Sequence, residues 1–292
     1  MPIFDQSYRA YTGQRTGRLA RIATIAYAGI RPLLRKKVFL LFLLIGAMRF
    51  LGYFVALYAR DYANLLGVST GAGPLERILP ASGPKLFYDF LVDSQFLTFV
   101  VATWVGSGLI ADDIASGALP LYLSRPISRI DYACGKLLSI VSVGSLLTLL
   151  PALLLWLLLS TKALGHGAPP PISLGAASVV ASMVVLVGYG MTLLAMSSLT
   201  SSRRMALVAF AAMFGVSSGV SDLLISATGR NPWMELLSFP GLFRIIGRAL
   251  FNPTPDLEIP TLLPFVAAGI VAGLLLVSAL VLWIRISSRS RP

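Results

Sequence analysis

Long apolar stretches dominate the sequence, and the shorter stretches between them carry most of the charges. Each apolar stretch reaches about 20 residues, the length that an α-helix needs to cross the hydrocarbon core of a bilayer. None shows the short alternating pattern of a barrel strand, so helices are the expected spans. Six spans are predicted, at residues 38–59, 90–110, 137–160, 172–199, 205–225 and 262–284. The pattern therefore predicts an all-α integral membrane protein.

The composition supports this fold class. Of the 292 residues, 56% are hydrophobic and 12% are charged, whereas soluble domains contain about 25% charged residues. The expected organisation is a basic cytoplasmic segment, 1–37, followed by a six-helix membrane domain, 38–292. A single cysteine, Cys134, excludes a disulfide framework and a thiolate zinc site.

Basic residues are distributed unevenly between the loops. If the N-terminus, the loops after spans two and four and the C-terminus share one side, that side carries 16 of the 24 Lys and Arg residues and the other side carries seven. Because basic loops stay in the cytoplasm, both termini are predicted to be cytoplasmic, in a multi-pass protein of the cell (inner) membrane. Anionic lipids account for this basic face, so membrane lipids are expected partners and nucleic acid is not.

Residues 15–31 show the periodicity of an amphipathic helix. Four apolar residues recur at helical spacing and share one side, namely Leu19, Ile22, Ala26 and Ile30. Arg21 and Arg31 lie on the opposite side, and Pro32 is expected to end the helix. We predict that this helix lies flat in the cytoplasmic interface of the membrane.

The stretch 110–138, which joins predicted spans two and three, is polar and charged. Asp112 and Asp113 mark the membrane exit, since a carboxylate that faces water costs far less than one inside the bilayer. Gly117 and Pro126 interrupt the remainder of the stretch, which predicts a short helix, a kink and a turn. The residues alone leave two alternatives. The loop lies on lipid headgroups with its basic side chains on phosphates, or its apolar centre docks on a soluble partner.

One run of residues within this stretch forms a sequence motif, which we call the specific run. It reads D-x-x-x-G-x-L-x-x-Y-L-S-R-P-I-S-R-x-x-Y-x-x-G-K, from Asp113 to Lys136. This run resembles the cytoplasmic loop after the second span of ABC-2 type ABC transporter permeases. The resemblance implies a coupling helix, within the loop 111–136, that docks on a separate ATP-binding subunit. The implied docking residues are Asp112, Asp113, Gly117, Leu119, Leu121, Tyr122, Leu123, Arg125, Pro126 and Arg129. It also implies that the helix at 15–31 packs beside this loop, the alternative being a simple membrane anchor.

The function implied by the resemblance is that of the permease subunit of an ABC-2 type exporter. The expected partners are a second permease subunit, identical or related, and two copies of the ATP-binding subunit. ATP and magnesium then belong to those partners, because Gly135-Lys136 lacks the rest of a phosphate loop. Ile130 stands where its first glycine would be, and Leu137 follows in place of Ser or Thr. We expect no cofactor, metal or catalytic site in this chain.

Two other classes of function compete with the exporter. The alternative is a membrane anchor or assembly scaffold, which recruits a soluble complex without moving a substrate. An intramembrane enzyme is disfavoured because the single histidine, His166, falls in a loop, and no paired carboxylates are expected to face the bundle.

A cation and an external segment complete the candidate features. Arg49 stands near the middle of span one, where it must face the bundle, reach the interface or find a partner. No acidic residue near the middle of a predicted span can pair with it. Its expected roles are a place in the substrate pathway or a structural bond to a neighbouring span. Residues 227–261 form an amphipathic external segment, either flat on the outer leaflet or dipping into the membrane as a re-entrant pair.

Overall fold

The computed structural model describes residues 17–65, 83–118, 122, 127–166, 172–228, 231–252 and 260–288. In these ranges the chain is helical and contains no β-strand. Five helices are long and apolar enough to cross a membrane, namely α2 (Lys37–Leu65), α4 (Pro84–Gly106), α9 (Ile172–Leu199), α10 (Arg203–Ala227) and α12 (Leu263–Ser288). A sixth span arises if the bent pair α7 (Arg129–Ser145) and α8 (Leu149–His166) counts as one. The all-helical membrane fold predicted from the apolar pattern is therefore confirmed.

Two spans begin earlier than the apolar runs predicted. Helix α4 begins at Pro84, six residues before the predicted residue 90, with Gly83 at a φ of 66° before it. Helix α7 begins at Arg129, because Ser128 and Asp131 form a reciprocal capping box. The apolar pattern misses the first turns of α4 and α7 because it ends at the first charged residue. The start of a helix is set instead by its N-cap and by proline at the first position.

The predicted third span is broken between α7 and α8, which meet at 42°. The Thr148 side chain and the backbone N–H groups of Leu147 and Thr148 all donate to the carbonyl of Gly144. Three residues further on, Pro151 has no N–H to offer the carbonyl of Leu147, so the regular helical ladder stops here.

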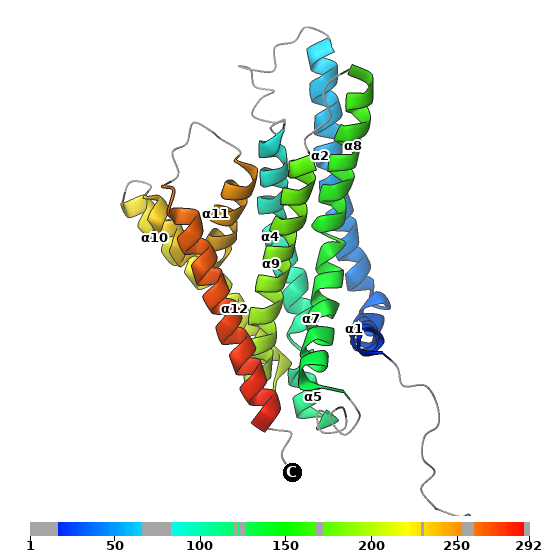
Figure 1. The fold of residues 1–292 in the computed structure, drawn as a ribbon, viewed down its shortest axis with the longest axis vertical. Coiled ribbons are helices and arrows are strands. Elements are labelled where there is room, and N and C mark those ends of the chain that lie inside the picture. The colour runs from blue at the N-terminus through cyan, green and yellow to red at the C-terminus, as the bar shows by residue number, and fades with distance from the viewer. Residues whose placement is uncertain are drawn as a thin grey trace, which may run out of the picture.

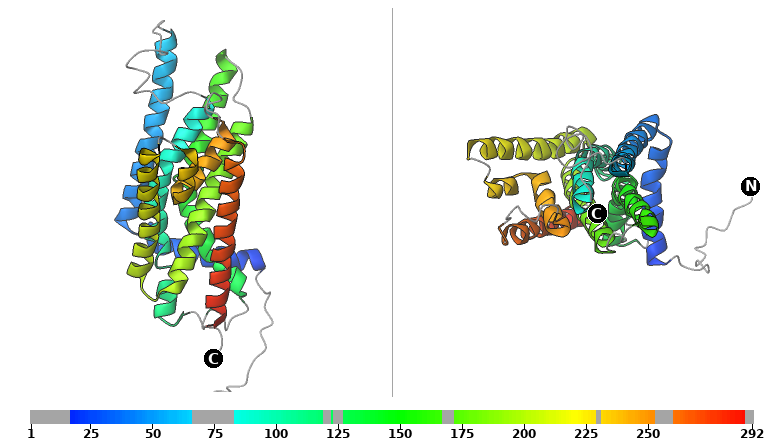
Figure 2. Two further views of the ribbon diagram at one scale, coloured as in Figure 1. Left: turned by 90° about the vertical axis from the view of Figure 1, so that its left-hand side faces the viewer. Right: turned by 90° about the horizontal axis from the view of Figure 1, so that it is seen from above.

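Helix α1 (Arg18–Leu34) crosses the foot of the bundle at a large angle to the other helices. It is seen end-on beside α2 in Figure 1 and along its length in Figure 2. The prediction that Pro32 ends this helix is wrong, because Pro32 lies inside it and the helix continues to Leu34. A proline this close to the C-terminus removes only one bond of the last turn. Ala26 of the predicted apolar side is buried, whereas Leu19 is 82% exposed.

Helix α9 occupies the centre of the bundle and packs against α4, α7, α8, α10, α12 and α11 (Phe239–Phe251). Its residues Tyr189, Leu193 and Leu194 are fully buried. Figure 2 shows α1 and α2 at one side of this centre and α10 and α12 at the other. The spans α2 and α10 keep most of their apolar side chains exposed, as expected for faces that meet lipid or another membrane subunit.

The segment after α10 turns back inside the bundle. A 3-10 helix, η1 (Pro232–Leu237), leads into α11 (Phe239–Phe251), whose side chains are mostly buried. The ring of Phe239 lies 5.2 Å from that of Tyr189 on α9 and 6.0 Å from that of Phe210 on α10, between ring centroids. Ser217 of α10 accepts a hydrogen bond from the N–H of Phe239. This packing favours the re-entrant alternative over a helix flat on the outer leaflet.

Candidate functional site

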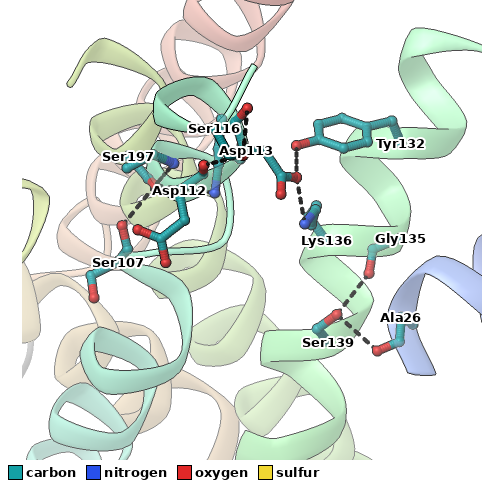
Figure 3. A network of polar contacts seen from close by, with 12 residues as sticks. Ala26, Ser107, Asp112, Asp113, Ser116, Tyr132, Gly135, Lys136, Ser139 and Ser197 are labelled. Atoms are coloured by element: carbon teal, nitrogen blue, oxygen red, sulfur yellow. Dashed lines mark hydrogen bonds and ion pairs between the residues drawn. The ribbon is translucent and has the colours of Figure 1, made fainter. Parts of the chain in front are cut away.

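The residues at the two ends of the specific run meet in space, at the junction of α5 (Ala111–Ala115) and α7. Lys136 Nζ lies 2.7 Å from Asp113 Oδ2, and the Tyr132 hydroxyl donates to the same oxygen at 2.6 Å. The Lys136 ammonium also lies 5.4 Å from the ring centroid of Tyr132 and 5.9 Å from that of Tyr122. Figure 3 shows Asp113 reaching from α5 towards Tyr132 and Lys136. We call these four residues the Asp113 cluster.

Local sequence explains how each half of the Asp113 cluster is positioned. Tyr132 and Lys136 are four residues apart, so they share one face of α7, and the capping box at Ser128 fixes where that helix begins. Helix α5 is short because Gly117 follows it with a φ of 67°, a conformation that glycine adopts without cost. The burial of the pair is substantial, since the Lys136 side chain is 9% exposed and that of Asp113 is 17% exposed.

The turn from α4 to α5 is held by a buried serine of the central helix. Ser197 Oγ on α9 accepts from the N–H of Ala111 at 3.0 Å and donates to the carbonyl of Ser107 at 2.9 Å. Figure 3 shows Ser197 beside Ser107. A serine in an apolar helix carries no sequence signal that distinguishes this role from packing, so sequence reasoning missed it. The effect is to fix the end of α4 and the start of α5 to the core.

Helix α1 packs along α7, its main neighbour. Ser139 of α7 donates to the carbonyl of Ala26 at 3.1 Å, and a Cβ added at Gly135 would lie 2.6 Å from Cγ2 of Ile25. Arg18 Nε donates to Asp131 Oδ1 at 2.6 Å, and this bond raises the pKa of the Arg18 guanidinium above its ordinary value. The absence of a side chain at Gly135 therefore allows α1 to lie close against the helix that carries Lys136.

The predicted docking residues fall into two groups. Leu119, Leu121, Leu123, Arg125 and Pro126 lie outside the described residues. Of the described ones, the Asp112 side chain is exposed, and Gly117 ends α5. Asp113 and Tyr122 belong to the Asp113 cluster. Arg129 bonds to Ser287 Oγ on α12 at 2.5 Å and lies 5.9 Å from the ring centroid of Trp283, so it links the start of α7 to the end of α12.

Arg49 has a partner on the neighbouring span. Its Nη2 donates to Ser94 Oγ on α4 at 2.5 Å, and its guanidinium carbon lies 4.4 Å from the ring centroid of Phe90. One turn along α2, the Tyr53 hydroxyl donates to Asp93 at 2.5 Å. Asp93 lies inside the predicted span 90–110, but its hydrogen bond is to Tyr53, and no ion pair with Arg49 is found among the described residues. A place for Arg49 in a substrate pathway stays a prediction.

A second charged cluster lies at the opposite end of α4, against η1 and α11. Glu235 of η1 pairs with Arg248 at 2.7 Å and with Arg244 at 3.3 Å, and its side chain is 8% exposed. The Nε of Arg248 also donates to the Tyr88 hydroxyl of α4 at 3.0 Å. We call Glu235, Arg244 and Arg248 the outer cluster. It attaches η1 and α11 to each other and to α4.

Comparison with known protein families gives one match. The sequence model that describes ABC-2 family transporter proteins matches residues 24–282, which includes all the helices from most of α1 to most of α12. A comparison with curated proteins finds no matching sequence. The match agrees with the resemblance carried by the run from Asp113 to Lys136 and extends it over almost the whole chain.

Proposed function

Since the chain belongs to the ABC-2 family of transporters, we propose that it is the permease of an ATP-driven exporter, powered by a separate ATP-binding subunit. The family match and the apolar helices support a multi-pass membrane subunit of an ABC transporter. In this proposal the segment 111–136 contacts the ATP-binding subunit. It transmits the conformational change of that subunit to the membrane spans.

The observation that carries this proposal is the Asp113 cluster. A docking loop can drive a permease only if its displacement moves the membrane helices. Asp113 follows α4 and Lys136 belongs to α7, so the 2.7 Å contact closes the loop between them onto the ends of two spans. Because an ion pair with little exposure resists separation, the two ends should move together.

Three further contacts distribute the same displacement. Ser197 links the α4–α5 turn to the central helix α9. Arg129 links the start of α7 to the end of α12. The close approach of Ile25 to Gly135 links α7 to α1. A loop that only recruited a soluble complex would not need connections to three further helices. We therefore favour transport over the scaffold alternative.

The remaining parts of the proposal come from the family and the charge distribution. Both termini and the loop 111–136 face the cytoplasm of the cell membrane, since 16 of the 24 basic residues then lie on that side. A second permease subunit, identical or related, completes the pathway, and two ATP-binding subunits bind ATP with magnesium.

The test is the purification of the full chain with its partners in mild detergent, comparing Leu121→Asp and Arg125→Glu with the native protein. Truncating an anchor in the centre of an interface costs about 1–2 kcal/mol or more, so we expect a loss of affinity of about five- to thirty-fold. The matched control is Arg204→Glu, an exposed arginine expected on the same face. If both variants keep a stoichiometric, active ATPase while the control behaves identically, the docking assignment is wrong and the loop lies on lipid instead.

A further inference from the structure

A cavity of about 340 Å³ lies where α1 crosses the ends of α4 and α5, next to the Asp113 cluster. This volume is within the range of about 300–1,000 Å³ that small-ligand sites occupy. Its walls come from α1, the α1–α2 connection, the end of α4, the α4–α5 turn with α5, Tyr122, α7 and the first residue of α10. The apolar part of the lining includes Ile25, Leu33, Val105 and Leu109.

Only some of the charged side chains in this lining form an ion pair with each other. Asp113 and Lys136 neutralise each other at 2.7 Å. Lys36, Arg203 and Asp112 also line the cavity, and no ion pair is found among these three. The two cations both lie beside Trp104. The Lys36 ammonium is 5.7 Å from the Trp104 ring centroid, and Arg203 donates to the Trp104 carbonyl at 2.6 Å.

Asp112 lies against Gly108, on the same side as Arg203. Its carboxylate and the Cδ of Arg203 both lie against Gly108, where an added Cβ would collide with the carboxylate. Figure 3 shows Asp112 directed away from Asp113, towards the side of Ser107. Among the described residues, the Asp112 carboxylate has no ion pair or hydrogen bond. The cavity thus presents two cations and one carboxylate beside an apolar wall.

Exposed apolar residues follow the lining residues along the chain. Leu34 is 49% exposed, Val38 is 44% exposed, and Met205 is 63% exposed, and each stands within two residues of a lining residue in sequence. In a membrane protein, exposed apolar residues at the ends of the spans meet the boundary between acyl chains and headgroups. A ligand that combines an acyl chain, a phosphate and an ammonium would match all parts of the lining.

We propose that this cavity binds the headgroup of a phospholipid that carries a primary amine, such as phosphatidylethanolamine. The phosphodiester lies between Lys36 and Arg203, and the ammonium donates to Asp112. An anionic lipid without an amine satisfies the cations and leaves Asp112 unpaired. A choline headgroup has no N–H to donate. This site borders α1, α5 and α7, so its occupancy stabilises the junction that carries the Asp113 cluster.

The test is native mass spectrometry of the full chain after exchange into an equimolar mixture of phosphatidylethanolamine, phosphatidylglycerol and phosphatidylcholine. The native protein should retain them in that order. Asp112→Asn should reduce the preference for phosphatidylethanolamine over phosphatidylglycerol by about ten-fold, because a charged hydrogen bond is lost. Lys36→Gln should reduce retention of both by about five-fold, as expected for one cation near a lipid surface.

Two controls separate this site from the general basic surface. Lys37→Gln and Arg204→Gln change exposed neighbours that do not line the cavity, and they should leave retention unchanged. If Lys37→Gln acts like Lys36→Gln, or if phosphatidylcholine is retained as well as phosphatidylethanolamine, the proposal is wrong. A further arm adds soluble glycerophosphoethanolamine. Displacement of the lipid at equal concentration would assign the cavity to a soluble phosphate compound and overturn the lipid assignment.

Discussion

At the end of the bundle that carries α5, Asp113 meets one cation, Lys136, whereas at the other end Glu235 meets two, Arg244 and Arg248. The charges of Asp113 and Lys136 balance, so removing either residue leaves the other charge unpaired. The second set carries an excess positive charge, so one arginine can be lost while a pair remains. The stoichiometry of the charges, more than their distances, therefore decides which substitution is costly.

The largest effect is expected at the one-to-one pair. Lys136→Met leaves the Asp113 carboxylate with only the Tyr132 hydroxyl, in a site where it is 17% exposed. Removing one partner of a buried ion pair costs about 3 kcal/mol. The free energy of unfolding in detergent micelles measures this loss.

The double variant of Asp113→Asn with Lys136→Met serves as its control. It should recover at least half of the loss, because no uncompensated charge remains. A loss below about 1 kcal/mol for Lys136→Met alone would mean that water already solvates the pair.

The outer cluster should respond asymmetrically. Glu235→Gln leaves two guanidinium groups without an acid and is expected to cost about 2 kcal/mol. Arg244→Gln leaves the contact between Glu235 and Arg248 at 2.7 Å intact and should cost less than about 1 kcal/mol. Hydrogen exchange of residues 231–252 measures both local stabilities. Equal effects of the two substitutions would contradict the two-to-one arrangement.

A smaller effect is expected where α1 rests on α7. Gly135→Ala places a methyl group against Ile25, at a separation of 2.6 Å before relaxation. Overpacking of this kind costs about 1–3 kcal/mol. It is relieved by a shift of α1 itself, because the Cβ of Ile25 at 2.7 Å and the carbonyl oxygen of Ile22 at 3.2 Å also face the added methyl group. Limited proteolysis after Arg31 measures the release of α1. Gly273→Ala, which meets no neighbour, is the control and should not change cleavage. Identical cleavage of both variants would mean that α1 is not held there.

The smallest effect is expected for Arg18→Ala. The Arg18 side chain is 61% exposed, so its bond to Asp131 is weakened by solvent and salt. Asp131→Ala should matter more, since it also removes the capping box of α7, at about 1 kcal/mol. Unfolding at low and high salt measures both. A loss for Arg18→Ala that matched that of Asp131→Ala at low salt and disappeared at high salt would show that the ion pair, not the cap, stabilises the helix start.

Sequence reasoning succeeded where one short pattern determines the result. The apolar runs predicted the spans, and for α9 the bounds 172–199 are those of the structure. The specific run brought Asp113, Tyr132 and Lys136 into one motif, and the four-residue spacing places the last two on one face. That Asp113 turns back to them could not be predicted, since it depends on the path of the chain between α5 and α7.

Sequence reasoning failed where the partner comes from a distant helix. Glu235 and Arg248 are separated by a proline-initiated helix start whose direction is fixed by serines of α10. Arg49 finds Ser94, one hydroxyl among many in apolar helices. Charged residues near a span also concealed the first turn of α4, because hydropathy cannot distinguish a charged helical turn from a loop.

The central claim is that this chain is driven by an ATP-binding partner seated on the loop 111–136. The most direct measurement is the identification of the proteins that co-purify stoichiometrically with the full chain in mild detergent, together with the ATPase activity of that complex. We expect a protein with its own phosphate loop, retained by the native chain and lost with Arg125→Glu but not with Arg204→Glu. A native chain that transports its substrate while co-purifying with no nucleotide-binding protein would contradict this claim.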